Sequence, residues 1–161
     1  MAKVQKVEEP LPVIPMLRSD FLSILVLGGL IGLLIWIVSV CMHRYVFDAY
    51  FCGGDIVRQC GSASTYSIVV GTLVGAVVAL GGLIRLRVYR PLLVLIASIL
   101  STWGIVQLSW SFSWLTGILI VIALFALTFG LYSWIARVRE FWLTLLLMVV
   151  LVVSVRLALM A

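Results

Sequence analysis

The sequence predicts an all-α integral membrane protein that crosses a lipid bilayer five times. Of its 161 residues, 65% are apolar and only 11% are charged, whereas a soluble domain is usually about 45–50% apolar and about 25% charged. The apolar residues form long runs, and about twenty residues are what one α-helix needs to cross a hydrocarbon core of about 30 Å. Water could not solvate so much apolar surface, so lipid is the expected solvent.

The N-terminal segment 1–20 is predicted to be a cytoplasmic tail, because Pro10, Pro12 and Pro15 interrupt any helix there. The first span follows at about 21–42. A secretory signal peptide is the alternative for this run, but its apolar stretch exceeds the usual core of a signal and no small-residue cleavage motif follows it. We therefore expect an uncleaved helix.

Residues 21–161 are predicted to form a single transmembrane domain, since no polar stretch is long enough to bury a core of its own. A polar outer loop is expected at about 43–65. The run from 91 to 136 is twice the length of one crossing, so the chain is expected to turn back near Trp110–Trp114, where aromatic rings suit the headgroup region. The remaining four spans are then expected at about 66–84, 91–110, 114–135 and 141–160, the third opening on Pro91, a residue favoured at a helix start.

Basic residues predict the orientation of these spans. Short loops with an excess of Lys and Arg stay in the cytoplasm. Five crossings place eight of the eleven basic residues on the side of the N-terminus: Lys3, Lys6, Arg18, Arg85, Arg87, Arg90, Arg137 and Arg139. The N-terminus is therefore expected inside and the C-terminus outside, in a multi-pass protein of the cell membrane. Arg outnumbers Lys nine to two and Asn is absent, a usage typical of a GC-rich prokaryotic genome.

Two cysteines lie in the predicted outer loop. Cys52 and Cys60 are eight residues apart, with Gly53 and Gly54 between them to let the chain turn. An outward-facing loop lies in an oxidising compartment, so a structural disulfide is expected. A redox-active pair is the alternative, but it favours C-x-x-C spacing and a second pair to relay electrons, whereas the third cysteine, Cys41, lies inside the first span.

The second span carries a stripe of small residues at four-residue spacing. At this spacing the side chains share one helix face and leave room for another helix to approach closely. The stripe is expected to pack within the bundle or, alternatively, against a partner protein or a second copy. Its members are Ser67, Gly71, Gly75, Ala79 and Gly82.

Polar groups within the spans are few. Every carboxylate lies in a tail or near a span end, whereas proton relays and ion-coupled transporters usually need one at mid-depth. Arg156 lies in the outer part of the fifth span, where it serves either as an interfacial anchor or as a contact for a partner or ligand. The third span could present a polar lining through Ser98, Ser101, Thr102 and Gln107.

No catalytic, cofactor or metal motif is present in the sequence. P-loop, G-x-S-x-G and H-E-x-x-H patterns are missing, and the single His43, with Arg44 and several aromatic residues, is expected to be part of an interfacial belt. No basic patch suits nucleic acid. The expected function is therefore that of an accessory or structural subunit that packs against other membrane proteins or itself. A small transporter or channel and a thiol-redox or lipid-modifying enzyme are the alternatives.

Overall fold

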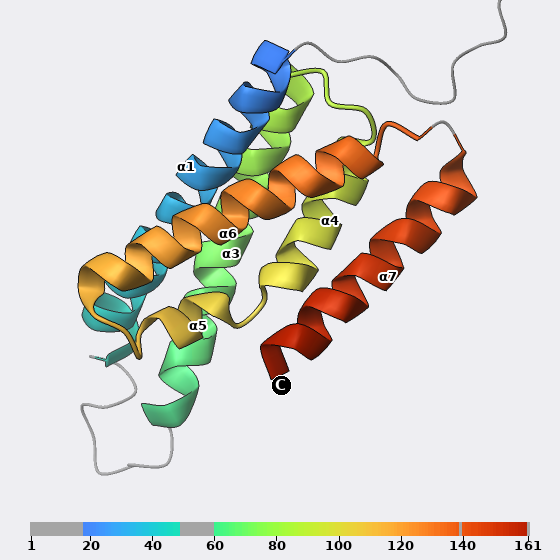
Figure 1. Ribbon diagram of the computed structural model, residues 1–161. Helices are drawn as coiled ribbons and strands as arrows, with labels where there is room; N and C mark the ends of the chain where they lie inside the picture. The colour runs from blue at the N-terminus through green and yellow to red at the C-terminus, as the bar shows by residue number, and fades with distance from the viewer. Residues whose placement is uncertain (1–17, 49–59, 139, 161) are drawn as a thin grey trace, which may run out of the picture.

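The computed structural model describes residues 18–48, 60–138 and 140–160, and they form helices joined by turns (Figure 1). This confirms the all-α fold. Three stretches, at 19–47, 63–85 and 114–135, are long and apolar enough to cross a membrane unaided. The elements in chain order are α1 (Arg18–Met42), the π-helical turn η1 (His43–Phe47), α3 (Cys60–Arg85), α4 (Pro91–Thr102), α5 (Ile105–Ser109), α6 (Trp114–Ile135) and α7 (Phe141–Met160).

The predicted bounds are reproduced for two of the five spans and differ for the other three. Helices α6 and α7 begin and end at the predicted residues. The predicted outer loop at 43–65, however, is helical at both ends, because α1 continues through η1 and α3 already begins at Cys60. Hydropathy marks where a helix meets lipid, and it does not mark where the helix ends. Residues 60–65 include Gly, Ser and Thr, which have low intrinsic helix propensity, and α3 nevertheless includes them.

The predicted third span is not one continuous helix. The chain leaves the helix at Trp103 and Gly104, and Gly104 has φ +91°, a left-handed conformation that glycine adopts without steric cost. Helix α4 alone, with 12 residues, is about 18 Å long at about 1.5 Å per residue and falls short of the hydrocarbon thickness. Only α4 and α5 together have the length of a crossing.

Helix α1 is the central element of the bundle. It packs against α3 and against α6, and its buried side chains, Ile24, Ile31 and Ile35, belong to the main hydrophobic core. Helix α4 contacts α3 and α6, while α7 lies at the edge against α4 and α6 (Figure 1). The described side chains of α7 are mostly exposed, and only Thr144 and Met148 among residues 141–157 are buried.

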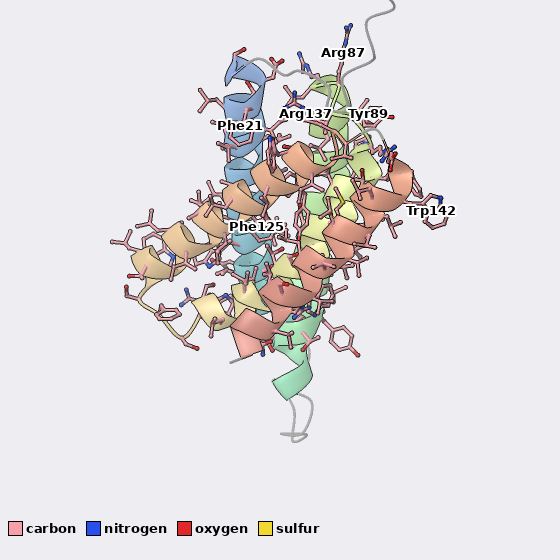
Figure 2. The ribbon with its side chains drawn as sticks, turned by 45° about the vertical axis from the view of Figure 1, so that its right-hand side comes forward. Phe21, Arg87, Tyr89, Phe125, Arg137 and Trp142 are labelled. Carbon is pink, nitrogen blue, oxygen red and sulfur yellow. The ribbon has the colours of Figure 1, made fainter. Side chains whose placement is uncertain are left out.

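The bundle has two chemically different ends. The start of α1, the α3–α4 turn and the α6–α7 turn lie together at one end (Figures 1 and 2). We call this the arginine end, after Arg85, Arg87, Arg90 and Arg137. The opposite end, which carries η1, α5 and the turn into α6, is called the aromatic end. The Arg90 guanidinium lies 4.9 Å from the ring centre of Tyr89 and 5.1 Å from that of Phe141.

Candidate functional site: an aromatic pocket

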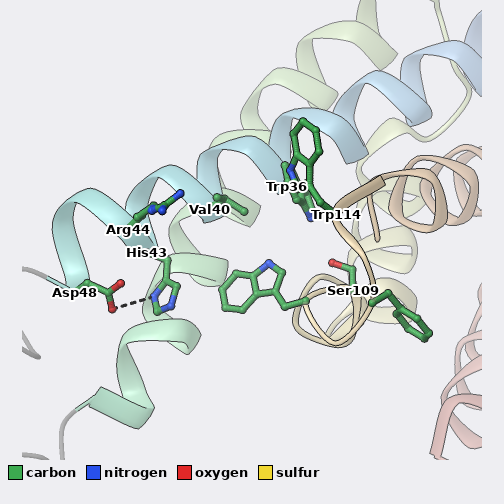
Figure 3. Close-up of a pocket in the computed structure, with 9 residues that line it drawn as sticks. Trp36, Val40, His43, Arg44, Asp48, Ser109 and Trp114 are labelled. Carbon is green, nitrogen blue, oxygen red and sulfur yellow. Dashed lines mark ion pairs between the residues drawn. The ribbon is translucent and has the colours of Figure 1, made fainter. Parts of the chain in front are cut away.

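A pocket of about 420 Å³ opens at the aromatic end, within the range of about 300–1,000 Å³ typical of small-molecule sites. It lies between the end of α1 with η1 on one side and α5 with the start of α6 on the other (Figure 3). Three of the six tryptophans of the chain line it. The lining residues are Trp36, Val40, His43, Arg44, Asp48, Ser109, Trp110, Phe112 and Trp114.

The π-helical turn at the end of α1 brings two polar side chains together. Positions five apart in an α-helix are rotated by about 140° from each other, so their side chains diverge. In η1 the backbone N–H of Asp48 bonds to the carbonyl of His43, five residues earlier, which is the wider π pattern. As a result, His43 Nδ1 lies 3.8 Å from Asp48 Oδ1, a pair marked by the dashed line in Figure 3.

Aromatic rings form most of the pocket wall. The His43 ring stacks on Trp110, with ring centres 5.0 Å apart and planes inclined by 16°. Trp36 and Trp114 approach to 6.3 Å at an angle of 51°. Both separations are favourable for aromatic pairs. Since Trp36 and His43 come from α1 and η1 while Trp110 and Trp114 flank the turn into α6, these contacts join the two walls of the pocket.

The pocket wall also holds polar atoms without hydrogen-bond partners. Among the described residues, Trp36 Nε1, His43 Nδ1 and Trp110 Nε1 are buried and make no hydrogen bond. An indole N–H can only donate, and leaving a buried donor unpaired costs about 1–3 kcal/mol. Two of these three atoms, the indole N–H groups, can only donate, whereas an imidazole nitrogen donates or accepts according to its tautomer.

The residue types of a nucleophilic triad, Ser109, His43 and Asp48, all line this pocket, but their geometry is not that of a triad. A triad needs the serine hydroxyl within about 3 Å of the imidazole. Here Ser109 Oγ donates to the backbone carbonyl of Val106 at 2.6 Å, and Figure 3 shows Ser109 across the pocket from His43. The arrangement is suited to holding a ligand and offers no activated nucleophile.

The predicted polar residues of the third span separate into two groups. Gln107 is exposed on α5, whereas Ser98, Ser101 and Thr102 are buried on α4. The Ser101 hydroxyl is hydrogen-bonded to that of Tyr132 on α6, and Thr102 Oγ1 donates to the Ser98 carbonyl at 2.7 Å. These two hydroxyls therefore take part in helix packing and local backbone pairing.

Arg156 contacts the interrupted helix. Its Nε donates to the carbonyl of Leu100 at 3.0 Å. Carbonyls in the last turn of a helix lose their regular donors, and Leu100 lies in the last turn of α4. The guanidinium thus joins α7 to the end of α4.

The small-residue stripe of α3 faces α1. A Cβ placed on Gly71 would lie 2.2 Å from Ser39 Oγ, and one on Gly75 would lie 2.3 Å from Ile35 Cγ1. The other members of the stripe also lie on this side: Ser67 and Ala79 are fully buried, and Gly82 is packed against Leu27. The stripe is therefore used within the chain.

The predicted disulfide cannot be located. Cys52 lies outside the described residues, and Cys60 is the first residue of α3. Cys41, on α1, is a free thiol. The disulfide stays a prediction.

Sequence reasoning assigned His43 and Arg44 to an interfacial belt and Trp110–Trp114 to a hairpin, without connecting them. One sequence signal could have indicated the pocket: charged and aromatic residues cluster at two span ends, and five crossings place these ends on the same side.

A metal site would need at least three His, Cys, Asp or Glu side chains close together, and the described residues contain no such group. Comparison with known protein families, curated proteins and solved structures found no significant match to this chain.

Proposed function

We propose that this chain is a small polytopic membrane protein without catalytic chemistry that works by binding, and that the aromatic pocket is its binding site. The observation that carries the proposal is the convergence of three tryptophans, a His–Asp pair and an arginine from separate elements on one pocket. Concave sites with aromatic walls and a few placed polar groups are the usual form of ligand sites.

The proposal includes five crossings with the arginine end in the cytoplasm. Helices α4 and α5 together make the third crossing, and α7 makes the fifth. The gathering of Arg85, Arg87, Arg90 and Arg137 at one end supports this orientation, because cytoplasmic loops are enriched in basic residues. The pocket then opens toward the outer headgroup layer, where tryptophan is favoured.

An accessory-subunit role is the second candidate, and α7 is the observation that favours it. The stripe on α3 is covered by α1, so a protein partner would use another surface. Helix α7 exposes most of its apolar length, including Trp142 at 78% and Leu157 at 64%. Under this reading, purification in mild detergent yields a stable complex that substitutions on the exposed face of α7 disrupt. A monomer in several detergents contradicts it.

A transport path receives less support. It would use the hydroxyls of α4, but Ser101 is paired with Tyr132 and Thr102 with the backbone. Both groups are buried between helices. Flux through proteoliposomes that falls on Ser101→Leu, without loss of folding, would restore the transporter reading.

The binding proposal is tested with two matched tryptophan variants. Trp114 is 69% exposed at the start of α6 and lines the pocket, and Trp142 is 78% exposed at the start of α7, away from it. The purified protein is screened by thermal unfolding against lipids and small polar solutes. We expect at least one compound to stabilise the wild type and Trp142→Ala, but not Trp114→Ala. Compounds that stabilise all three proteins equally, or none of them, would refute the pocket as a binding site.

A further inference from the structure

We propose that the arginine end holds an anionic phospholipid, with one acyl chain in a groove between α1 and α3 and the phosphate on Arg85. This site lies at the opposite end of the bundle from the aromatic pocket, so the inference goes beyond the proposed binding function. It shares with that proposal only the topology in which the arginine end faces the cytoplasm.

The groove is a hollow of about 430 Å³ where α1 and α3 pack against each other. The two helices lie side by side up to the arginine end (Figure 1). Leu27 of α1 and Gly82 of α3 line the groove and are only partly exposed. A Cβ added to Gly82 would lie 2.7 Å from Leu27 Cδ1, so these two residues are in direct contact and close the bottom of the groove.

The wall on the side of α1 is an apolar strip that suits an acyl chain. Leu22, Val26 and Leu30 line the groove and recur every four residues, so they share one face of α1. They are 61%, 61% and 57% exposed, and the eight residues from the first to the last span about 12 Å of helix. Lipid tails are as apolar as leucine, and a tail that lies along this strip would be held on both sides by the helices.

A positive charge lies at one end of this apolar groove. Arg85, in the last turn of α3, lines the groove and is exposed. Among the described residues it has no carboxylate partner, and the described wall of the groove contains no carboxylate. A guanidinium can bind two phosphate oxygens at once. The groove therefore complements a lipid with a net negative charge.

A second groove at the arginine end lacks this combination. It has a volume of about 340 Å³ and lies between α1 and α6. Its lining residues are Phe21, Leu25, Leu127, Gly130, Leu131 and Trp134. None of them is charged, so this second groove can accept an apolar tail without selecting a headgroup. Of the two, the groove between α1 and α3 is the one that joins apolar length to a charge.

The proposed topology places this charge where anionic headgroups lie. The cytoplasmic leaflet carries anionic lipids, and basic pockets between helices on that side suit their headgroups. The neighbouring Arg87 shows how a site differs from a general attraction. It is also exposed, but it does not line the groove, and Figure 2 shows its side chain directed away from the bundle. A lipid held in the groove would therefore depend on Arg85 much more than on Arg87.

The experiment measures lipid-dependent thermal unfolding of the full chain purified in a maltoside detergent. The probes are phosphatidylglycerol, phosphatidylcholine with the same acyl chains, and soluble glycerol phosphate. Arg85→Gln has Arg87→Gln as its matched control, since each removes one exposed charge from the same end of the bundle. Val26→Trp fills the groove, and Val77→Trp is its control, because Val77 is 74% exposed on α3 and does not line the groove.

We expect phosphatidylglycerol to stabilise the wild type, Arg87→Gln and Val77→Trp, with an affinity at least about tenfold weaker in Arg85→Gln and in Val26→Trp. Phosphatidylcholine that binds the wild type as tightly would refute the recognition of charge. Equal losses in Arg85→Gln and Arg87→Gln would show a diffuse attraction in place of a site. Glycerol phosphate that binds as tightly as the lipid would refute the contact with the acyl chain.

Two further variants keep the test decisive. If Arg85→Gln fails to fold, Val26→Trp decides, because an unchanged affinity in that variant would refute the groove. Trp114→Ala should keep its affinity for phosphatidylglycerol, since Trp114 lines the pocket at the aromatic end. A loss of that affinity in Trp114→Ala would place the lipid in the aromatic pocket and refute the site at the arginine end.

Discussion

The packing of α3 on α1 predicts a large difference between two Gly→Ala substitutions on the same helix. At Gly71 an added Cβ would lie 2.2 Å from Ser39 Oγ, 3.0 Å from the Ile35 carbonyl oxygen and 3.2 Å from the Ser39 nitrogen. At Gly81 an added Cβ would meet no atom within 4 Å. Both substitutions gain the same helix propensity, about 1 kcal/mol, so their comparison isolates the steric effect.

The magnitude follows from which atoms can move. The Ser39 hydroxyl makes no hydrogen bond and could rotate away, but the Ile35 carbonyl and the Ser39 nitrogen belong to the backbone of α1. The two helices must therefore separate by a few tenths of an ångström. Overpacking of this kind costs about 1–3 kcal/mol. For a chain of this length, that places the melting temperature of Gly71→Ala about 2–12 °C below that of Gly81→Ala.

The assay is thermal unfolding of Gly71→Ala and Gly81→Ala in the same detergent, followed by loss of helical circular dichroism. We expect Gly81→Ala to melt at or above the wild-type temperature and Gly71→Ala to melt clearly below Gly81→Ala. If both variants melt together, the close approach of α3 to α1 is wrong.

Three further predictions concern hydrogen bonding, oxidation and sidedness. A double-mutant cycle with Ser101→Ala and Tyr132→Phe should give a coupling free energy of about 0.6 kcal/mol, the average for hydrogen bonds between membrane helices, and additive single effects would show that the two hydroxyls do not interact. Titration of the denatured protein with a maleimide reagent should modify one cysteine before reduction and all three afterwards, because a Cys52–Cys60 disulfide is expected; three reactive thiols without reduction would disprove it. In a cysteine-free background, an impermeant maleimide should label Tyr45→Cys on intact cells and label Arg87→Cys only after permeabilisation, and the reverse pattern would invert the proposed topology.

Hydropathy and helix length predicted a large part of this fold. The bounds of α6 and α7 follow from apolar length and from the basic turn that separates them. The interruption at Gly104 was not predicted, because a single glycine inside an apolar run is tolerated in many membrane helices. The end of α4 also makes a tertiary contact, the hydrogen bond from Arg156 to the Leu100 carbonyl, and sequence periodicity does not encode such contacts.

The aromatic pocket was less accessible to sequence reasoning. Its residues were visible individually, and Trp110 and Trp114 were expected near a membrane surface. The contacts of Trp110 with His43 and of Trp114 with Trp36 depend on how α1 and α6 cross, and the pairing of His43 with Asp48 depends on a π turn. Neither the crossing geometry nor the π turn has a local sequence signal, since a five-residue spacing does not indicate proximity in a regular helix.

Helix α1 meets each of two neighbours through glycines. Gly71 and Gly75 of α3 face it on one side, and its own Gly28 and Gly32 face Phe125 and Phe129 of α6 on the other. The order of synthesis then matters, because α3 emerges soon after α1 whereas α6 emerges much later. Until α6 is inserted, the notch at Gly28 and Gly32 can be filled only by acyl chains or by another protein. Chains that end before α6 should therefore be the ones that membrane quality control removes.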